Sequence, residues 1–201
     1  MAPKDWELRP PDEQYYASRT DYFRQGDIFR DVPLGYPMPP EAFSHSAGSR
    51  KFLSGPFEPG FGLLLTPTCS MTAQGEAGAY AHPVRTLAPV LPLVRLVDDG
   101  AVKAGALDDL RRFDHLVNYL YLPAIDDASM PESLALLYAA ITIHHDYLEG
   151  CGDDDGDDDP DSGSRRIAQL SEVAAVHLKY KLTALFAGEL FAHADFTDTI
   201  R

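Results

Sequence analysis

"FGLLLTPTCSM", residues 61–71, joins a short apolar run to a Thr-Pro-Thr-Cys turn. A short, continuous apolar run that is stopped by a proline predicts a fully buried β-strand. Cys69 stands just after that strand, among the hydroxyls of Thr66, Thr68 and Ser70. Side chains at the end of a buried strand commonly emerge at a site, so this turn is the first candidate for function.

Two segments on either side of this stretch predict further strands. "QGDIFRDVPL" (25–34) is entered through Gly26 and carries Ile28 and Phe29 before a proline stops it. "APVLPLVRLV" (88–97) is similarly apolar, and its two prolines favour an edge strand or a bulge. Residues 35–60 contain five prolines and four glycines, which predicts a long surface loop between the first two strands.

The second half of the chain predicts two helices and one ambiguous segment. Apolar residues at helical spacing predict a helix over 106–120. Residues 131–148 begin with a helix-start pattern but contain β-branched residues at 141–143, so the local sequence leaves helix and strand open. A long C-terminal helix is expected over 169–191, with Ser171 as its N-cap.

The size and composition of the chain are typical of one globular domain. It has 201 residues, 45% of them hydrophobic, and no apolar run approaches the roughly 20 residues that cross a bilayer. The first residues lack the basic flank and apolar core of a secretory signal, so we expect a cytoplasmic protein. Two cysteines cannot form a disulfide framework. We expect an N-terminal arm (1–22) and a body over 23–148.

The charge of the chain is strongly acidic and unevenly spread. The formal net charge is −14, which repels phosphate backbones and argues against a nucleic-acid partner. Seven of the aspartates lie in "GDDDGDDDPDSG" (152–163). This tract predicts a solvated, flexible loop over 151–164. A calcium-loop interpretation fits it less well because the closing bidentate Glu is missing.

The order of the motifs resembles the MazF/PemK toxin family. The resemblance rests on four pieces: "QGDIF", "FGLLLT", "APVLPL", and "ESLALLYAAITIHHDYLEG" followed by "RRIAQLSEVAAVHLKYKL". Gly26, Asp27 and Ile28 match the Gly-Asp-Ile of the family's first strand. The family's Arg-Ile-x-x-Leu-Ser ending is matched by Arg166, Ile167, Leu170 and Ser171.

This resemblance implies an α+β fold built on a small SH3-like β-barrel. Residues 134–145 would then be strand, the helix over 106–120 and the acidic loop would be insertions, and the Arg-Ile-x-x-Leu-Ser ending would run into the C-terminal helix. It also implies a bacterial protein of the toxin–antitoxin type. Family members are typically ribonucleases that use an arginine at the start of the second strand and a threonine or serine at the end of the third. Neither position is matched in this sequence.

A cysteine-based site is the chemical alternative. A thiol nucleophile needs a base, and His82 is the histidine nearest to Cys69 in sequence, while Asp27 could orient that histidine. The sequence favours a structural role for Cys69 over catalysis, because a free cysteine is commonly a small buried hydrophobe. His144 and His145 are adjacent and cannot easily chelate one ion, so we predict no metal and no cofactor.

Three functional hypotheses remain open on the sequence. The first is a binding or regulatory module that has lost ribonuclease activity and works through a protein partner or a homodimer. Its contacts would come from Thr66, Thr68, Ser70 and Tyr121, with Tyr121 among tyrosines at the barrel mouth. The second is a hydrolase or transferase that uses Cys69. The third is a ribonuclease whose catalytic residues lie at other positions than in the family, such as Arg24, Arg30 or Arg85.

Overall fold

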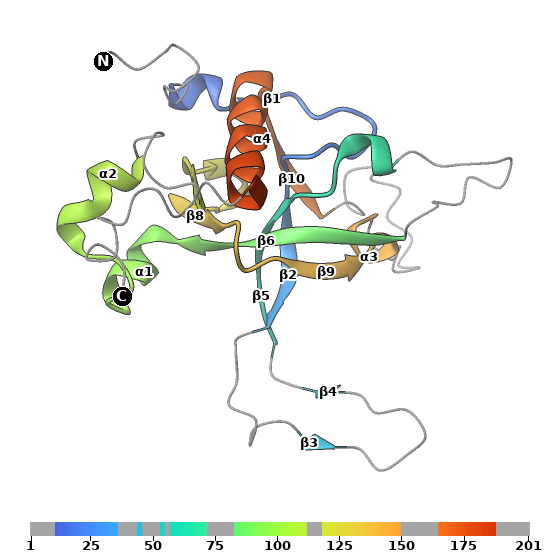
Figure 1. Cartoon of the computed structure of the whole chain (residues 1–201), viewed down its shortest axis with the longest axis horizontal. Helices are drawn as coiled ribbons and strands as arrows, with labels where there is room; N and C mark the ends of the chain where they lie inside the picture. The colour runs from blue at the N-terminus through green and yellow to red at the C-terminus, as the bar shows by residue number, and fades with distance from the viewer. Residues whose placement is uncertain are drawn as a thin grey trace, which may run out of the picture.

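The structure of the chain is a computed structural model, shown in Figure 1. It describes residues 11–35, 44–45, 53–54, 57–71, 83–111, 118–149 and 165–187, and all structural statements below concern these ranges. The acidic tract over 151–164, His82 and most of the loop over 35–60 lie outside them.

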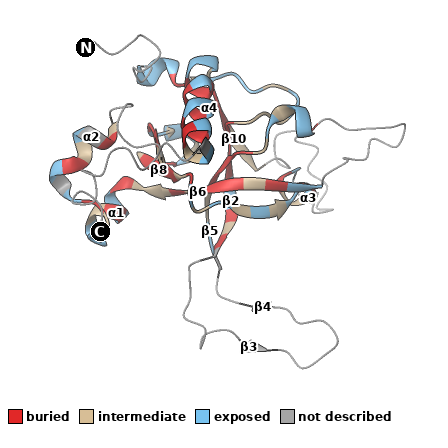
Figure 2. Cartoon of the chain, viewed as in Figure 1, coloured by how far each residue is buried: buried red, intermediate tan, exposed pale blue. Residues whose placement is uncertain are grey.

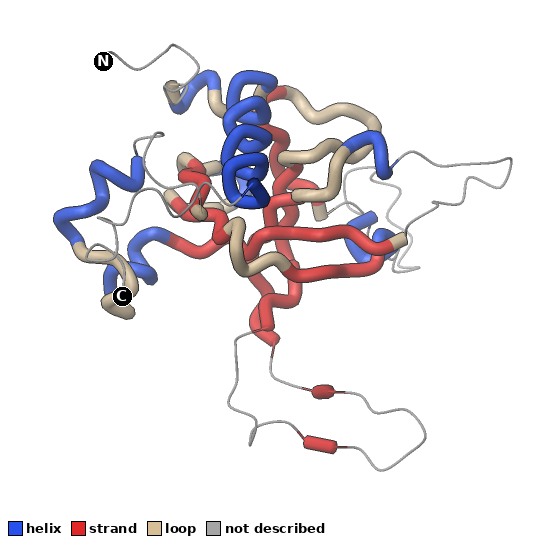
Figure 3. The backbone as a smooth tube through the Cα atoms, viewed as in Figure 1, coloured by secondary structure: helices blue, strands red, loops and turns tan. Residues whose placement is uncertain are grey.

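The fold is α+β and is organised around one antiparallel sheet of eight strands (Figure 3). Along the sheet the order is β1 (Tyr16–Ala17), β10 (Arg166–Leu170), β2 (Asp27–Gly35), β5 (Phe57–Leu64), β6 (Val84–Pro92), β8 (Ser133–Leu136) and β7 (Tyr119–Leu122). The eighth strand, β9 (Ile141–His144), pairs with the first half of β6. β3 (Ser44–His45) and β4 (Leu53–Ser54) form a separate pair.

Short helices join the strands, and one longer helix covers the sheet. The α-helices are α1 (Leu93–Asp98), α2 (Leu107–Arg111), α3 (His145–Glu149) and α4 (Glu172–Ala187). The 3-10 turns are η2 (Asp12–Gln14), η4 (Thr68–Met71), η5 (Ala104–Ala106) and η6 (Asp126–Ala128). Among the described helices, none is long and apolar enough to cross a membrane.

The sheet curls into a half-barrel, and its two end strands are tied together by tyrosine hydroxyls. Tyr15, next to β1, donates to the backbone carbonyl of Tyr121 in β7. Tyr16 donates to the carbonyl of Pro123 at 2.7 Å. A register shift between Phe29 and Val32 interrupts the β2–β5 ladder. Such bulges bend a strand and increase its twist, which helps the sheet to curl.

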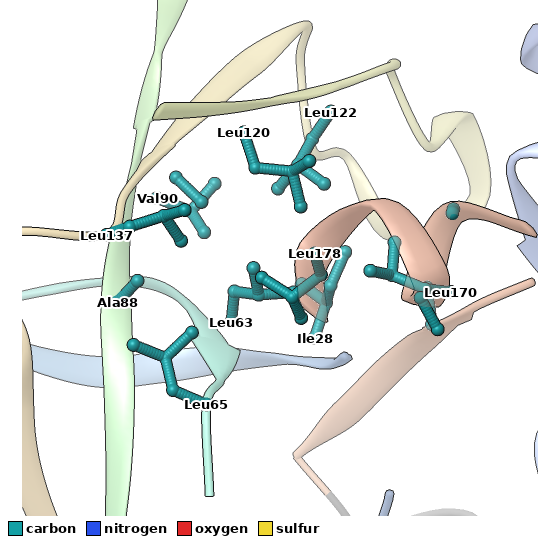
Figure 4. Packing of buried hydrophobic residues seen from close by; sticks show 14 of the residues in the cluster. Ile28, Leu63, Leu65, Ala88, Val90, Leu120, Leu122, Leu137, Leu170 and Leu178 are labelled. Carbon is teal, nitrogen blue, oxygen red and sulfur yellow. The ribbon is translucent and has the colours of Figure 1, made fainter. Parts of the chain in front are cut away.

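The core fills the space between the curled sheet and α4. Ile28, Leu63 and Leu178 come from β2, β5 and α4, are fully buried, and meet at its centre (Figure 4). Close packing of β5 on its neighbours requires glycine at position 62. A Cβ there would lie 2.9 Å from Leu87 Cδ2 and 3.1 Å from Val32 Cγ2. The "GLLL" of the opening motif therefore ends strand β5 with the buried Leu63 and Leu64, followed by the buried Leu65, and its glycine lies against two neighbouring strands.

Two sequence expectations need correction. The predicted strand over 88–97 is β6, but it begins at Val84 and ends at Pro92, where α1 takes over. Proline cannot donate to the ladder, and Leu93 and Leu96 are buried at helical spacing in a satellite core. Of the predicted helix over 106–120, the described part is α-helical at Leu107–Arg111, residues 112–117 lie outside the described ranges, and Tyr119–Leu122 are strand β7. Leu120 and Leu122 are fully buried in the barrel core, so tertiary packing overrides their helical spacing.

The remaining elements agree with the expectations. Residues 131–148, left open by local pattern, contain the strands β8 and β9, as the resemblance implied for 134–145, and they end in the helix α3, which it did not imply. The C-terminal helix is confirmed as Glu172–Ala187, while residues 169–170 finish β10. Ser171 caps this helix by accepting a hydrogen bond at Oγ from the amide of Ala174 at 3.3 Å.

Candidate functional site

The hydroxyls around Cys69 hold the turn after β5 in place. Thr66 Oγ1 accepts from the amide of Thr86 at 2.8 Å, and Thr68 Oγ1 accepts from the amide of Gln25 at 3.1 Å. These bonds attach the turn to β6 and to the segment that enters β2. Cys69 itself lies on η4 and is exposed, so it is not the buried hydrophobe that one interpretation of the sequence offered.

Asp27, the acidic residue of the Gly-Asp-Ile motif, is completely buried. Its Oδ2 accepts from the amide of Arg24 at 2.8 Å and from Arg166 Nη1 at 3.1 Å. Burial raises the pKa of the Asp27 carboxyl, while the Arg24 amide and the Arg166 guanidinium act in the opposite direction. Within the described residues this carboxylate therefore closes the turn before β2 and joins β2 to β10, and it has no bond to Cys69.

Two of the three residues of the cysteine hypothesis, Cys69 and Asp27, are described, and no hydrogen bond between them is seen. His82 lies outside the described residues, and the Asp27 carboxylate faces arginines. Gln25 is the residue that bridges the two regions, because its Nε2 donates to the carbonyl of Leu65 at 2.7 Å. The Gly-Asp-Ile turn and the Cys69 turn are thus neighbours, joined by hydrogen bonds between side chains and backbone groups.

A second buried polar cluster joins β6 to α3. Arg85 is fully buried, and its Nε donates to His145 Nδ1 at 3.0 Å. His145 Nε2 lies 2.8 Å from Glu149 Oε1. A histidine that accepts at Nδ1 and donates at Nε2 is the neutral tautomer. Desolvation, assisted by the Arg85 charge, lowers the pKa of His145, while Glu149 and Asp146 act to raise it.

Little in the sequence indicated this cluster. Arg85 was considered only as a relocated ribonuclease residue, and a guanidinium with 0% exposure cannot reach an RNA phosphate. The available signal was the alternation of β6, in which Arg85 and Leu87 share a face with apolar partners. An arginine at such a position requires an internal acceptor.

Tyr121 is positioned by a third polar cluster. Its hydroxyl donates to Glu132, which also receives Arg111 Nε at 2.7 Å and Nη2 at 2.9 Å. Tyr121 is 7% exposed, so its ring serves the fold. Of the other tyrosines expected near it, Tyr119 and Tyr138 do meet edge to face, with ring centroids 5.6 Å apart.

A pocket of about 810 Å³ lies between α4 and the adjoining ends of β5 and β6. It is lined mainly by apolar side chains, and Thr66 is the one sequence-predicted binding residue among the lining residues described. Lys179, on α4, contributes the ammonium group at this pocket. Among the described residues no group of three or more His, Cys, Asp or Glu side chains could hold a metal ion.

The outward face of α4 is unusually apolar. Val173 is 53% exposed, Val176 52% and Tyr180 45%, while the opposite side of the helix is buried in the core (Figure 2). The sequence signal was present but was not used: the helix carries one apolar stripe through Leu178 and Leu182, and a second through the valines and Tyr180. Only the first stripe was predicted.

The comparisons with known proteins do not extend this picture. No protein-family model matches the chain, and no curated protein is significantly similar to it. The likeness to the MazF/PemK family therefore rests on the order of the sequence motifs and on the curled antiparallel sheet.

Proposed function

We propose that this protein is a cytoplasmic, divergent barrel of the MazF/PemK kind that acts as a protein-binding module without ribonuclease activity. It docks an amphipathic helix of a partner protein along the outward face of α4. The observation that carries the proposal is the exposed apolar stripe of Val173, Val176 and Tyr180. An exposed apolar stripe along one helix face is typical of interaction sites.

The spacing of the stripe fits a helical partner. Positions 173, 176 and 180 follow the i, i+3, i+7 pattern that places knobs of one helix in the holes of another. α4 has 16 residues and is therefore about 24 Å long, enough for three to four turns of a partner. Glu172, next to Val173, borders the stripe and would favour a partner with a cation at the facing position.

The pairing of buried ionisable side chains with one another also favours a binding function over catalysis. Asp27 is paired with Arg166, Arg85 with His145, and Arg111 with Glu132. Each pair joins two elements of the fold, so each has a structural role. A catalytic group instead needs access to a substrate. The family's own catalytic positions are also unmatched in the sequence.

Site-specific photo-crosslinking tests this proposal. A benzophenone amino acid at Val176 is expected to give a covalent adduct in cells of the native host. The crosslinked peptide should map to an amphipathic helix. The matched control places the same probe at Val94, which is 63% exposed on α1. Sedimentation of the purified protein distinguishes a second copy from another protein. Equal adducts from both positions, or none from Val176, would refute the docking face.

A further inference from the structure

We propose that the pocket beside α4 binds a small amphipathic carboxylate, with an apolar body in the pocket and a single carboxylate at Lys179. The site goes beyond the proposed docking of a partner, because it uses a different flank of the helix. Lys179, Leu182 and Thr183 face the pocket, whereas Val173, Val176 and Tyr180 form the outward stripe.

The size of the pocket suits a small molecule. Its volume of about 810 Å³ falls within the range of roughly 300–1,000 Å³ that is usual for ligand sites. At about 30 Å³ for each water molecule of liquid, it equals roughly 27 waters. A ligand of up to about 25 non-hydrogen atoms therefore fits, which includes a medium-length alkyl or aryl carboxylate.

The interior of the pocket is apolar. Leu65 follows β5, Leu182 belongs to the buried side of α4, and both are less than a tenth exposed. Pro67, Val84 and Phe186 continue the apolar surface toward solvent. Val84 and Phe186 are 50% and 81% exposed, so a ligand that covers them removes apolar area from water. This lining selects a hydrocarbon or aromatic body.

The polar groups of the pocket select the sign of the ligand charge. Among the described residues the Lys179 ammonium has no ion-pair or hydrogen-bond partner, and no carboxylate lines the pocket. Thr183 sits one turn further along α4, and its hydroxyl donates to the carbonyl of Lys179 at 2.8 Å. A carboxylate at this place would gain a charge-assisted hydrogen bond from the ammonium.

The net charge of the chain further restricts the class of ligand. The chain carries a formal net charge of −14, which repels multiply charged anions such as nucleotides. One cation in an apolar setting can offset one carboxylate, and Lys179 is the only lysine or arginine among the described lining residues. We therefore assign the site to monocarboxylates and not to phosphates.

Calorimetric titration with decanoate tests the assignment. Decanoate is expected to bind with one-to-one stoichiometry and more tightly than uncharged decanol or decylamine. Octanoate should bind more weakly, by up to about fourfold for each methylene removed. Lys179→Gln should weaken decanoate binding roughly fivefold to tenfold without changing the binding of decanol. Lys103→Gln is the control, because it removes the same charge from an exposed lysine outside the pocket.

A second variant tests the location. Ala140 lines the pocket and is exposed, so Ala140→Trp fills the space without disturbing the core and should abolish binding. Equal affinity for decanoate and decanol would overturn the role of Lys179. Absence of decanoate binding, or unchanged binding in Ala140→Trp, would overturn the site itself. A short peptide ending in leucine that displaces decanoate and binds more tightly would contradict a small-molecule occupant. None of these results affects crosslinking at Val176, so the two proposals fail separately.

Discussion

At the scale of single residues, the contacts of the buried polar groups explain the roles of motifs whose roles could not be read from the sequence. The aspartate of "QGDIF" was predicted as a possible partner of a catalytic histidine, yet its carboxylate receives an amide and a guanidinium. Sequence alone could not distinguish these roles, because the partner Arg166 lies 139 positions away. The exposure of Cys69 was equally inaccessible to local pattern, since the turn geometry of η4 decides it.

Asp27→Asn should destabilise the fold. The substitution removes the negative charge that faces Arg166, whose side chain is only 10% exposed, and it leaves a guanidinium with less compensation. We expect a loss of about 2–4 kcal/mol in the free energy of unfolding, measured by urea denaturation. Asp98→Asn, on the exposed end of α1, should change it by less than about 0.5 kcal/mol. Equal effects of the two substitutions would show that the Asp27 pair is not structural.

His145 should make stability depend on pH. Its pKa is lowered from 6.5 in the folded state, mainly by burial, so the unfolded chain binds the proton more readily. The contribution of His145 to the free energy of unfolding is therefore fully present above pH 6.5. It is lost as the pH falls through the lowered pKa of the folded state. His145→Gln keeps an acceptor for Arg85 but cannot be protonated, so this part of the pH dependence should disappear. Unfolding curves between pH 5 and 8 check this.

His144→Gln is the matched control for this experiment. His144 is the adjacent residue and its side chain is 55% exposed. The substitution should leave the slope of stability against pH unchanged. A flat profile in the parent protein, or the same slope after His145→Gln, would contradict a structural role for the neutral imidazole.

At the scale of elements, short apolar runs and helix caps could be predicted and element boundaries could not. "FGLLL" and "GDIF" are strands and Ser171 caps α4, because each of these signals is local. The failure at 106–120 has a physical cause. Leucines at helical spacing also fit a strand when alternate residues face a core, and β7 pairs with β8 over Tyr119–Leu122. That pairing is invisible until the sheet is assembled.

The two faces of α4 should respond differently to truncation. Leu178 is fully buried, so Leu178→Ala should cost about 2–5 kcal/mol in the free energy of unfolding. Val176 is 52% exposed, and Val176→Ala should change the same quantity by less than about 0.5 kcal/mol. Urea denaturation of both variants measures this contrast. A large loss in Val176→Ala would mean that the outward stripe supports the fold and is not available to a partner.

At the scale of the whole molecule, the curl of the sheet determines where function can lie. Tyr15 and Tyr16 connect the β1 end of the strand order to the β7 end, and α4 packs over the core that this closure creates. The α+β class and the barrel-like sheet were predictable from motif order. The pocket was not, because α4 and two strand ends build it together.

Removing one closing hydroxyl should loosen the ends of the sheet. Tyr16→Phe deletes the bond to the carbonyl of Pro123 while keeping the ring. The expected loss is about 1 kcal/mol, with faster amide hydrogen exchange in β1 and β7 and unchanged exchange in β5 and β6. Tyr22→Phe, at a tyrosine that is 60% exposed, is the control. Uniformly faster exchange through the whole sheet would contradict a closure that acts only at its ends.

The central claim of the proposed function is that this protein binds a protein partner and does not cut RNA. The most direct measurement is incubation of the purified protein with labelled single-stranded RNA in the presence of a metal chelator. No cleavage is predicted, since Arg85 is buried and the family's catalytic positions are unmatched. Metal-independent cleavage that co-purifies with the protein and is lost in Arg30→Ala or Arg24→Ala would contradict the account.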